Sequence, residues 1–215
     1  MNWFLKINNA TYFWMLCIAC VLANFAANYF LYTDELYYST YGEQFTVTQI
    51  QKIVSFQNSF WIKAFSYSIV PLVIIIRVLF TSFCLYVGNL VNESHWKFHS
   101  VYAVSLKADI VFLFNLISNF CYYAISNNYK TMEDLSINCS SLLKIVGKEN
   151  IPNWLVFAYN SINLFELLYI VLLILFIKAG FHISHFKSVI FVLLTYCIGY
   201  YLYVVGLTFL YLNFS

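Results

Sequence analysis

Five long apolar runs constrain the fold of this chain more than any other feature. They cover residues 11–32, 64–91, 101–126, 155–177 and 188–212. A helix of about 20 apolar residues spans the ~30 Å hydrocarbon core of a bilayer, because each residue advances the helix by about 1.5 Å. The runs therefore predict an all-α fold: a polytopic transmembrane helical bundle of about five spans, with residues 1–215 as a single transmembrane domain.

The composition excludes a water-soluble fold. The chain is 62% hydrophobic, 21% aromatic and only 9% charged, whereas about a quarter of the residues in a soluble domain are charged. No single core of this size could bury so many large apolar groups, so lipid must cover the excess. The net charge of +2 is too small to indicate a nucleic-acid-binding surface. We expect the lipid bilayer as the main partner and exclude nucleic acid.

The placement of lysines predicts the orientation in the membrane. The short connections on one side carry four lysines with Glu93 as the only acid: Lys6, Lys97, Lys178 and Lys187. The longer connections on the other side carry five lysines diluted by six acids: Lys52, Lys63, Lys130, Lys144 and Lys148. Because short cytoplasmic loops are enriched in Lys and Arg, we expect a cytoplasmic N-terminus and, after five spans, a C-terminus outside.

The two longer connections carry amphipathic patterns. Apolar residues recur at roughly helical spacing in the first, at Val47, Ile50, Ile53, Val54, Phe60 and Trp61. The second repeats the pattern less cleanly, at Met132, Leu135, Leu142, Leu143 and Val146. Such patterns predict amphipathic helices that lie in the membrane interface, and a capping role without activity accounts for both.

Two segments of the chain carry a recognisable pattern of helices and turns. The first is residues 79–114, LFTSFCLYVGNLVNESHWKFHSVYAVSLKADIVFLF. Its pattern predicts a helix that ends in a glycine turn at Gly88, then a polar stretch, the aromatic Phe98 and a new helix. Residues 160–196 form a Phe-led helix, a glycine after a basic residue, a Ser-Lys turn and a final span. In both segments the chain resembles the Yip family of membrane proteins, named for its Rab-GTPase-interacting eukaryotic members. Only Gly88 stands where a glycine pair is common, and Lys107-Ala108-Asp109 interrupts a stretch that is usually uncharged.

The resemblance implies five helices and a cytoplasmic N-terminus. The long N-terminal segment of the eukaryotic members is missing, so their trafficking role is not carried over. A bacterial-type relative fits better, which implies a location in the bacterial inner membrane.

Four ionisable residues lie within the predicted spans: Arg77, Lys107, Asp109 and Glu166. Each costs several kcal/mol in hydrocarbon, so partners or a water-filled cavity are expected. Arg77 and Glu166 fall near the midplane and Asp109 nearly as deep, while Lys107 is shallower and can extend toward the inner surface. We therefore expect Arg77 to pair with Glu166 or Asp109. Two interpretations remain open: a structural ion pair or contact with a partner subunit, and a proton or ion pathway.

All four histidines fall on the predicted cytoplasmic side, as His95 and His99 in one turn and His182 and His185 in the other. Two pairs at helical spacing could supply four nitrogens to a metal ion, although ordinary polar interfacial residues fit the pattern as well. No catalytic or cofactor-binding motif is present in the sequence, so no catalytic residue or cofactor is assigned.

These features favour a non-enzymatic membrane component that works through a membrane protein partner, a homo-oligomer or the organisation of the bilayer. The alternative is a small transporter, or a transporter subunit, that uses the midplane charges Arg77, Asp109 and Glu166. A membrane enzyme that uses the histidine pairs is a third hypothesis.

Overall fold

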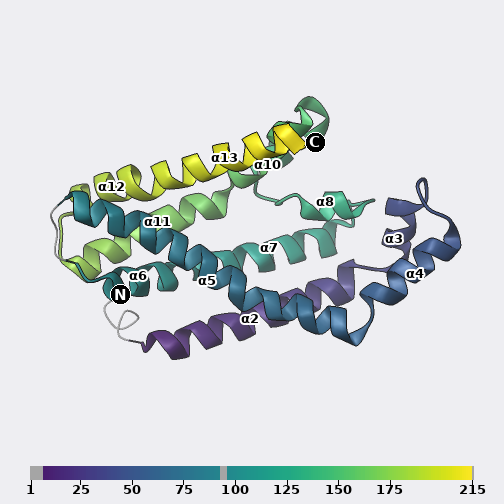
Figure 1. Ribbon diagram of the computed structural model, residues 1–215, viewed down its shortest axis with the longest axis horizontal. Helices are drawn as coiled ribbons and strands as arrows, with labels where there is room; N and C mark the ends of the chain where they lie inside the picture. Colours follow the sequence, from purple (N-terminus) through teal and green to yellow (C-terminus); the bar gives the residue numbers. More distant parts are fainter. Residues whose placement is uncertain (1–6, 93–95, 215) are drawn as a thin grey trace.

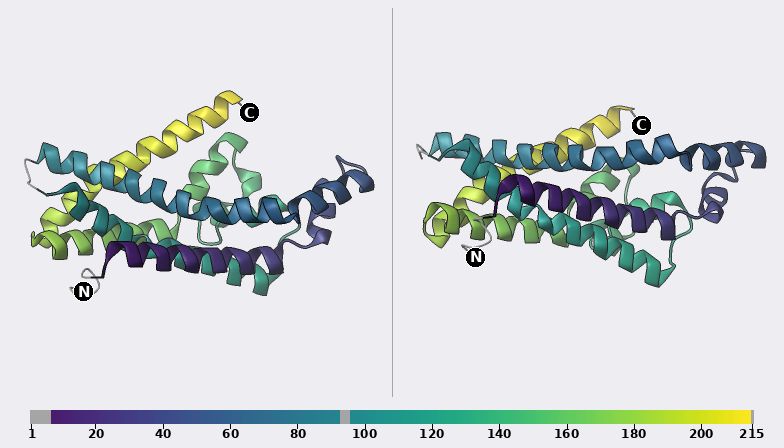
Figure 2. Two further views of the ribbon diagram at one scale, coloured as in Figure 1. Left: turned by 60° about the horizontal axis from the view of Figure 1, so that its bottom comes forward. Right: turned by 90° about the horizontal axis from the view of Figure 1, so that it is seen from below.

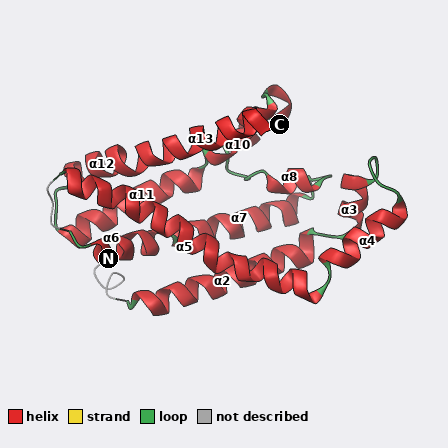
Figure 3. Cartoon of the chain, viewed as in Figure 1, coloured by secondary structure: helices red, strands yellow, loops and turns green. Residues whose placement is uncertain are grey.

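The computed structural model describes residues 7–92 and 96–214 and is all-α. Figure 1 shows the elements in chain order, and Figure 3 shows how little of the described chain lies outside helices. The membrane-length segments are built from α2 (Asn9–Leu31), α5 (Phe60–Val91), α6 (Phe98–Ala108), α7 (Ile110–Ser126), α11 (Leu164–Phe181), α12 (His185–Val192) and α13 (Ile198–Phe214). The connections hold α3 (Asp34–Tyr41), α4 (Val47–Gln57), α8 (Met132–Ser136), α9 (Leu142–Val146), η1 (Lys148–Asn150), η2 (Asn153–Leu155) and α10 (Val156–Ser161).

Within residues 7–92 and 96–214, five helical segments are long and apolar enough to cross a membrane, which confirms the predicted fold class. They are Asn9–Leu31, Phe60–Val91, Phe98–Ser126, Leu164–Phe181 and His185–Asn213. Large apolar side chains remain exposed along them, among them Phe25 at 55%, Ile76 at 58% and Phe209 at 63%. Surface of this kind is stable only against lipid or another apolar partner. By the composition of its helices the chain is a polytopic membrane protein.

The fourth span begins later than the sequence suggests. The apolar run starts at residue 155, but α10 ends at Ser161, and α11 starts at Leu164 after an extended residue, Ile162. The side chain of Asn163 accepts a hydrogen bond from the backbone N–H of Glu166 and so caps α11. An Asn side chain that caps a helix start favours a break at that point, and this places Glu166 in the first turn of α11 rather than at its middle.

The long helices run lengthwise through the bundle at various inclinations and give it two ends (Figures 1 and 2). We call one the turn end, where α2 begins at Asn9, α6 begins at Phe98 and α11 ends at Phe181. The other is the loop end, where α2 finishes at Leu31 and α7 at Ser126. Figures 1 and 2 show the start of α2 at the turn end and the close of α13 directed toward the loop end. The start of α2 and the close of α13 therefore lie toward opposite ends of the bundle.

Two apolar clusters form the core, and α5 contributes to both. The smaller joins α2, α5 and α6 through Tyr12, Leu16, Cys17, Cys20, Ile74, Val78 and Leu106. The larger joins α5, α6, α7, α11 and the last span through Leu85, Val101, Val104, Ala108, Val111, Tyr169, Leu173, Ile174, Phe176, Ile177, Phe191, Val192 and Tyr196. Both α5 and α6 contribute to the two clusters, and α2 also packs on α7 across the bundle.

Both connections at the loop end contain helices, as the amphipathic patterns predict. In the first, α4 presents Ile50 inward with 1% exposure and leaves Val47 61% exposed. In the second, α8 and α9 are single-turn helices, and Leu143 of α9 is buried. The two connections touch, because Ser39 donates to the carbonyl of Lys130 at 2.5 Å.

Two glycines allow α5 to approach the last span closely. A Cβ atom at Gly88 would lie 1.9 Å from Cγ2 of Thr195, and one at Gly199 would lie 2.5 Å from Sγ of Cys84. Thr195 lies in η3, a π-helical turn at Leu193–Cys197 that joins α12 to α13. Helix packing around small residues is a usual way to bring membrane helices together.

Candidate functional site

An ion pair with a buried carboxylate and a partly exposed guanidinium joins α5 to the third span. Nε of Arg77 donates to Oδ1 of Asp109 and Nη2 donates to Oδ2, both at 2.6 Å. The guanidinium carbon also lies 3.9 Å from the centre of the Phe112 ring. Asp109 is 1% exposed. A two-bond contact between a guanidinium and a carboxylate is the strongest geometry available to such a pair.

The local structure of the third span places Asp109 for this contact. α6 ends at Ala108 and α7 begins at Ile110, so Asp109 lies at a break between the two helices. The N–H of Phe112 donates to the carbonyl of Asp109 at 3.0 Å, a tighter turn than an α-helix makes. The break brings the carboxylate to the face of α5 that carries Arg77.

Glu166 has a different partner. Its carboxylate accepts a 2.5 Å hydrogen bond from the hydroxyl of Tyr196, and Glu166 is 7% exposed. Tyr196 lies in the π-helical turn η3, and turns of this kind often mark functional positions. The structure therefore pairs Arg77 with Asp109, and within residues 7–92 and 96–214 it records no ion pair between Arg77 and Glu166.

Aromatic side chains connect the two polar contacts. Tyr169 of α11 is fully buried and its hydroxyl donates to Thr81 at 3.0 Å. The ring of Tyr169 lies 4.9 Å from that of Phe112, which packs on Arg77, and 5.4 Å from that of Tyr196. Tyr169 and Thr81 are not among the site residues predicted from the sequence, although polar groups within an apolar span are a signal for contacts between helices.

Lys107 lies apart from the Arg77–Asp109 pair. It is 1% exposed and lines a pocket at the turn end. Its backbone carbonyl accepts a hydrogen bond from the hydroxyl of Tyr12 at 3.1 Å, which ties α2 to α6. Residues two apart on a helix do not share a face. The side chains of Lys107 and Asp109 accordingly lie in different surroundings.

The two turns that carry the histidines meet in space. The ring of Trp96 stacks on that of Phe181 with centroids 4.0 Å apart. His99 lies in the first turn of α6, His182 follows α11 in a left-handed conformation, and His185 opens α12. Within residues 7–92 and 96–214, no group of three His, Cys, Asp or Glu side chains is placed to hold a metal ion. His95 lies outside the described residues.

A polar cluster holds the second connection against α7. The side chain of Asn138 donates to Asn115 at 3.0 Å, and the N–H of Cys139 donates to Asn119 at 2.8 Å. Nearby, burial opposes ionisation of Asp134, but N–H groups of Lys130 and Thr131 lie 2.9 Å from its Oδ2. These donors outweigh the burial and hold the pKa of the Asp134 carboxyl below its ordinary range.

No family model, characterised protein or solved structure matches the chain. Its description as an integral membrane protein rests on its own five apolar helices.

Proposed function

We propose that the chain is a non-enzymatic multi-pass membrane protein that acts through partner proteins or through the organisation of the bilayer. The observation that carries this proposal is the surroundings of Arg77. Asp109 engages Nε and Nη2 of the guanidinium, yet the Arg77 side chain remains 30% exposed. In the part of the chain that the structure describes, no acceptor is recorded for Nη1.

The depth of Arg77 makes this exposure significant. At a rise of about 1.5 Å per residue, Arg77 lies about 21 Å from the Val91 end of α5 and about 26 Å from the Phe60 end. A guanidinium cannot give up its proton, and hydrocarbon offers it no acceptor. An acceptor from a neighbouring protein, or from a second copy of this chain, would complete its hydrogen bonding. We also propose, from the sequence resemblance alone, that the chain is a bacterial-type Yip protein of the bacterial inner membrane.

A photocrosslinking experiment tests the partner role. Benzoylphenylalanine in place of Val73 stands one turn from Arg77 on the same face, and Val73 is 49% exposed. We expect this variant to form a protein adduct on irradiation in its native membrane. The matched control is the same substitution at Leu79, which is 43% exposed and points away from the Arg77 face. Adducts with lipid alone at both positions would reject the partner proposal.

A second candidate, a small proton-coupled transporter, is favoured by the contact between Glu166 and Tyr196. Glu166 is a buried acid whose carboxylate accepts a hydrogen bond from the phenol of Tyr196. A carboxyl in such a place could exchange a proton. Reconstituted liposomes distinguish the two functions: a transporter would carry proton flux that Glu166→Gln abolishes. The partner role predicts no such flux and an unchanged adduct at position 73 in the Glu166→Gln variant.

The proposed orientation has the turn end in the cytoplasm and the C-terminus outside. It is tested with single cysteines introduced into a variant whose six native cysteines are replaced by alanine. Glu43→Cys lies in the exposed connection between α3 and α4, and Ser184→Cys lies in the exposed turn before α12. A membrane-impermeant maleimide added to intact cells should label position 43 and reach position 184 only after the cells are permeabilised. The reverse pattern would invert the orientation.

A further inference from the structure

A groove of about 460 Å³ runs along one face of the last span. The residues of this span that line the groove recur every three or four positions, among them Cys197, Tyr200, Val204, Thr208 and Leu212. Positions at this spacing form one continuous stripe of a helix. The groove therefore follows the span from Cys197 to Leu212, a length of about 22 Å.

The opposite wall of the groove comes from η2, α10 and the extended residue Ile162 that follows α10. The ring of Phe157 in α10 stacks on that of Tyr211 with centroids 6.0 Å apart. The hydroxyl of Tyr200 donates to the carbonyl of Ser161 at 3.0 Å. These contacts fix α10 beside α13. Because α10 has only six residues, a length of about 9 Å, it covers less than half of the groove.

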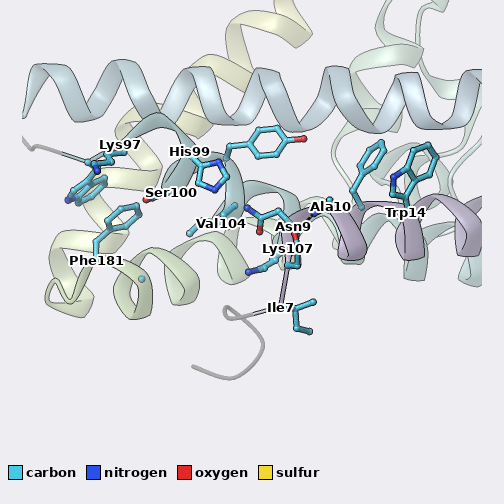
Figure 4. A pocket seen from close by; sticks show the side chains of 16 residues that line it. Ile7, Asn9, Ala10, Trp14, Lys97, His99, Ser100, Val104, Lys107 and Phe181 are labelled. Atoms are coloured by element: carbon cyan, nitrogen blue, oxygen red, sulfur yellow. Dashed lines mark hydrogen bonds between the residues drawn. The ribbon is translucent and has the colours of Figure 1, made fainter.

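The lining of the groove is apolar. Among the described residues, no Asp, Glu, Lys, Arg or His lines it. The hydroxyl of Thr208 donates to the carbonyl of Val204 at 2.7 Å, and that of Tyr200 is engaged by α10. The pocket at the turn end differs, since Asn9 and Lys107 place polar groups in its middle (Figure 4). Ordered water needs two to four polar partners, so the groove suits hydrocarbon rather than water or a polar ligand.

The width of the groove distinguishes a hydrocarbon chain from a helix. A volume of about 460 Å³ spread over about 22 Å corresponds to a mean cross-section of about 20 Å². A helix with its side chains is at least about 10 Å across and needs about 80 Å². An unbranched acyl chain is narrow enough for the groove, and a helix from another protein is too wide.

We propose that the groove binds one acyl chain of a phospholipid from the surrounding bilayer. The chain lies between α13 and α10, and the headgroup stays outside, beside Trp154. This residue belongs to the connection at the loop end, lines the groove and is 39% exposed, and indole rings are usual at the level of the headgroups. The bound chain supports α13 where α10 does not reach it. The site is independent of the partner contact proposed at Arg77.

Quenching of tryptophan fluorescence by a brominated phospholipid tests this assignment. Every tryptophan except Trp154 is replaced by phenylalanine, so that the groove alone reports. The full-length protein is kept in a steroid-based detergent, which has no linear alkyl chain to compete. It is titrated with a phosphatidylcholine that carries bromine on its acyl chains. We expect the quenching to saturate when one equivalent of lipid is bound, because a groove of this width holds one chain.

A substitution that fills the groove should remove this binding. Val205 lines the groove and is 45% exposed, so Val205→Phe adds its ring at the surface and leaves the core intact. It should weaken the saturable quenching at least about tenfold, because the ring displaces two or more methylene groups that are worth about fourfold each. The matched control is Val171→Phe on α11, which is 49% exposed and outside the groove lining. It should change the affinity by no more than about twofold.

A second reporter is the protein whose sole tryptophan is Trp14, 60% exposed on α2 and outside the groove lining. Its quenching should rise with the lipid content of the micelle without saturating at one equivalent. The same saturation at Trp14 and Trp154, or equal effects of Val205→Phe and Val171→Phe, would overturn the assignment. A purified particle that contains a second protein and leaves Trp154 unquenched would identify the groove as a protein contact instead. Tighter binding of a free fatty acid than of the phospholipid would overturn the phospholipid source.

Discussion

Replacing Arg77 by methionine should destabilise the folded bundle by about 3–5 kcal/mol, the largest effect expected of a single side chain here. Methionine fills most of the space of the arginine stem, so the loss is mainly that of the charge. Asp109, which is 1% exposed, would be left without its cation in a medium that cannot solvate it. Reversible unfolding of the purified protein in mixed micelles of mild detergent and dodecyl sulfate measures the change in free energy.

A double variant separates two contributions to the free energy of unfolding: that of the Arg77–Asp109 ion pair, and the cost of leaving one charge buried without its partner. Arg77→Met combined with Asp109→Leu should recover most of the lost stability, because no charge remains buried. Lys178→Met, a change of the same kind at an exposed cation, should fall within about 0.5 kcal/mol of the unmodified protein. If Arg77→Met is as mild as Lys178→Met, the two side chains do not form a buried pair in the folded protein.

The five spans can be predicted from the sequence because the solvent is the bilayer. A run of 20 or more apolar residues has few alternatives to a membrane-crossing helix, since every backbone polar group must be satisfied within the segment. The need of Arg77 for an acid follows from the same cost, because no acid shares its span. These expectations depend on length and depth alone.

The choice between the two acids could not be predicted, because it depends on a helix start that leaves little trace in hydropathy. The apolar run from residue 155 contains neither glycine nor proline before Leu164. The break is made by Asn163, whose side chain competes for the backbone at the start of α11. The position of Glu166 within the apolar run 155–177 predicts a mid-span location. The structure places Glu166 in the first turn of α11, where it contacts Tyr196.

Contacts between helices that are distant in the sequence also could not be predicted from the sequence. The stacking of Trp96 on Phe181 brings the two turns together, although nothing in either turn specifies the other. The pocket at the turn end likewise needs Asn9 of α2, Lys107 of α6 and Phe181 of α11. Such convergence is set by helix packing angles, which follow from the shapes of many side chains rather than from a local pattern.

The second large effect is expected from Gly88→Ala, at about 1–3 kcal/mol of destabilisation. The added methyl group would overlap Cγ2 of Thr195, which lies 1.9 Å from the Cβ position. Alanine is the better helix former, but membrane helices stay helical when they separate, so this preference offsets little of the clash. The same micelle unfolding experiment reports the loss as weaker packing of α5 against the last span.

Thr195→Ser provides the rescue, because it removes the clashing Cγ2 and retains the hydroxyl that donates to Phe191 at 2.7 Å. Combined with Gly88→Ala it should restore part of the stability. Recovery is incomplete because Cβ of Thr195 still lies 3.0 Å from the new methyl group. Gly206→Ala is the control: nothing lies within 4 Å of its Cβ position, so the change should stay within about 0.5 kcal/mol. Equal effects of Gly88→Ala and Gly206→Ala, or no recovery with Thr195→Ser, would mean that α5 and the last span do not meet at Gly88.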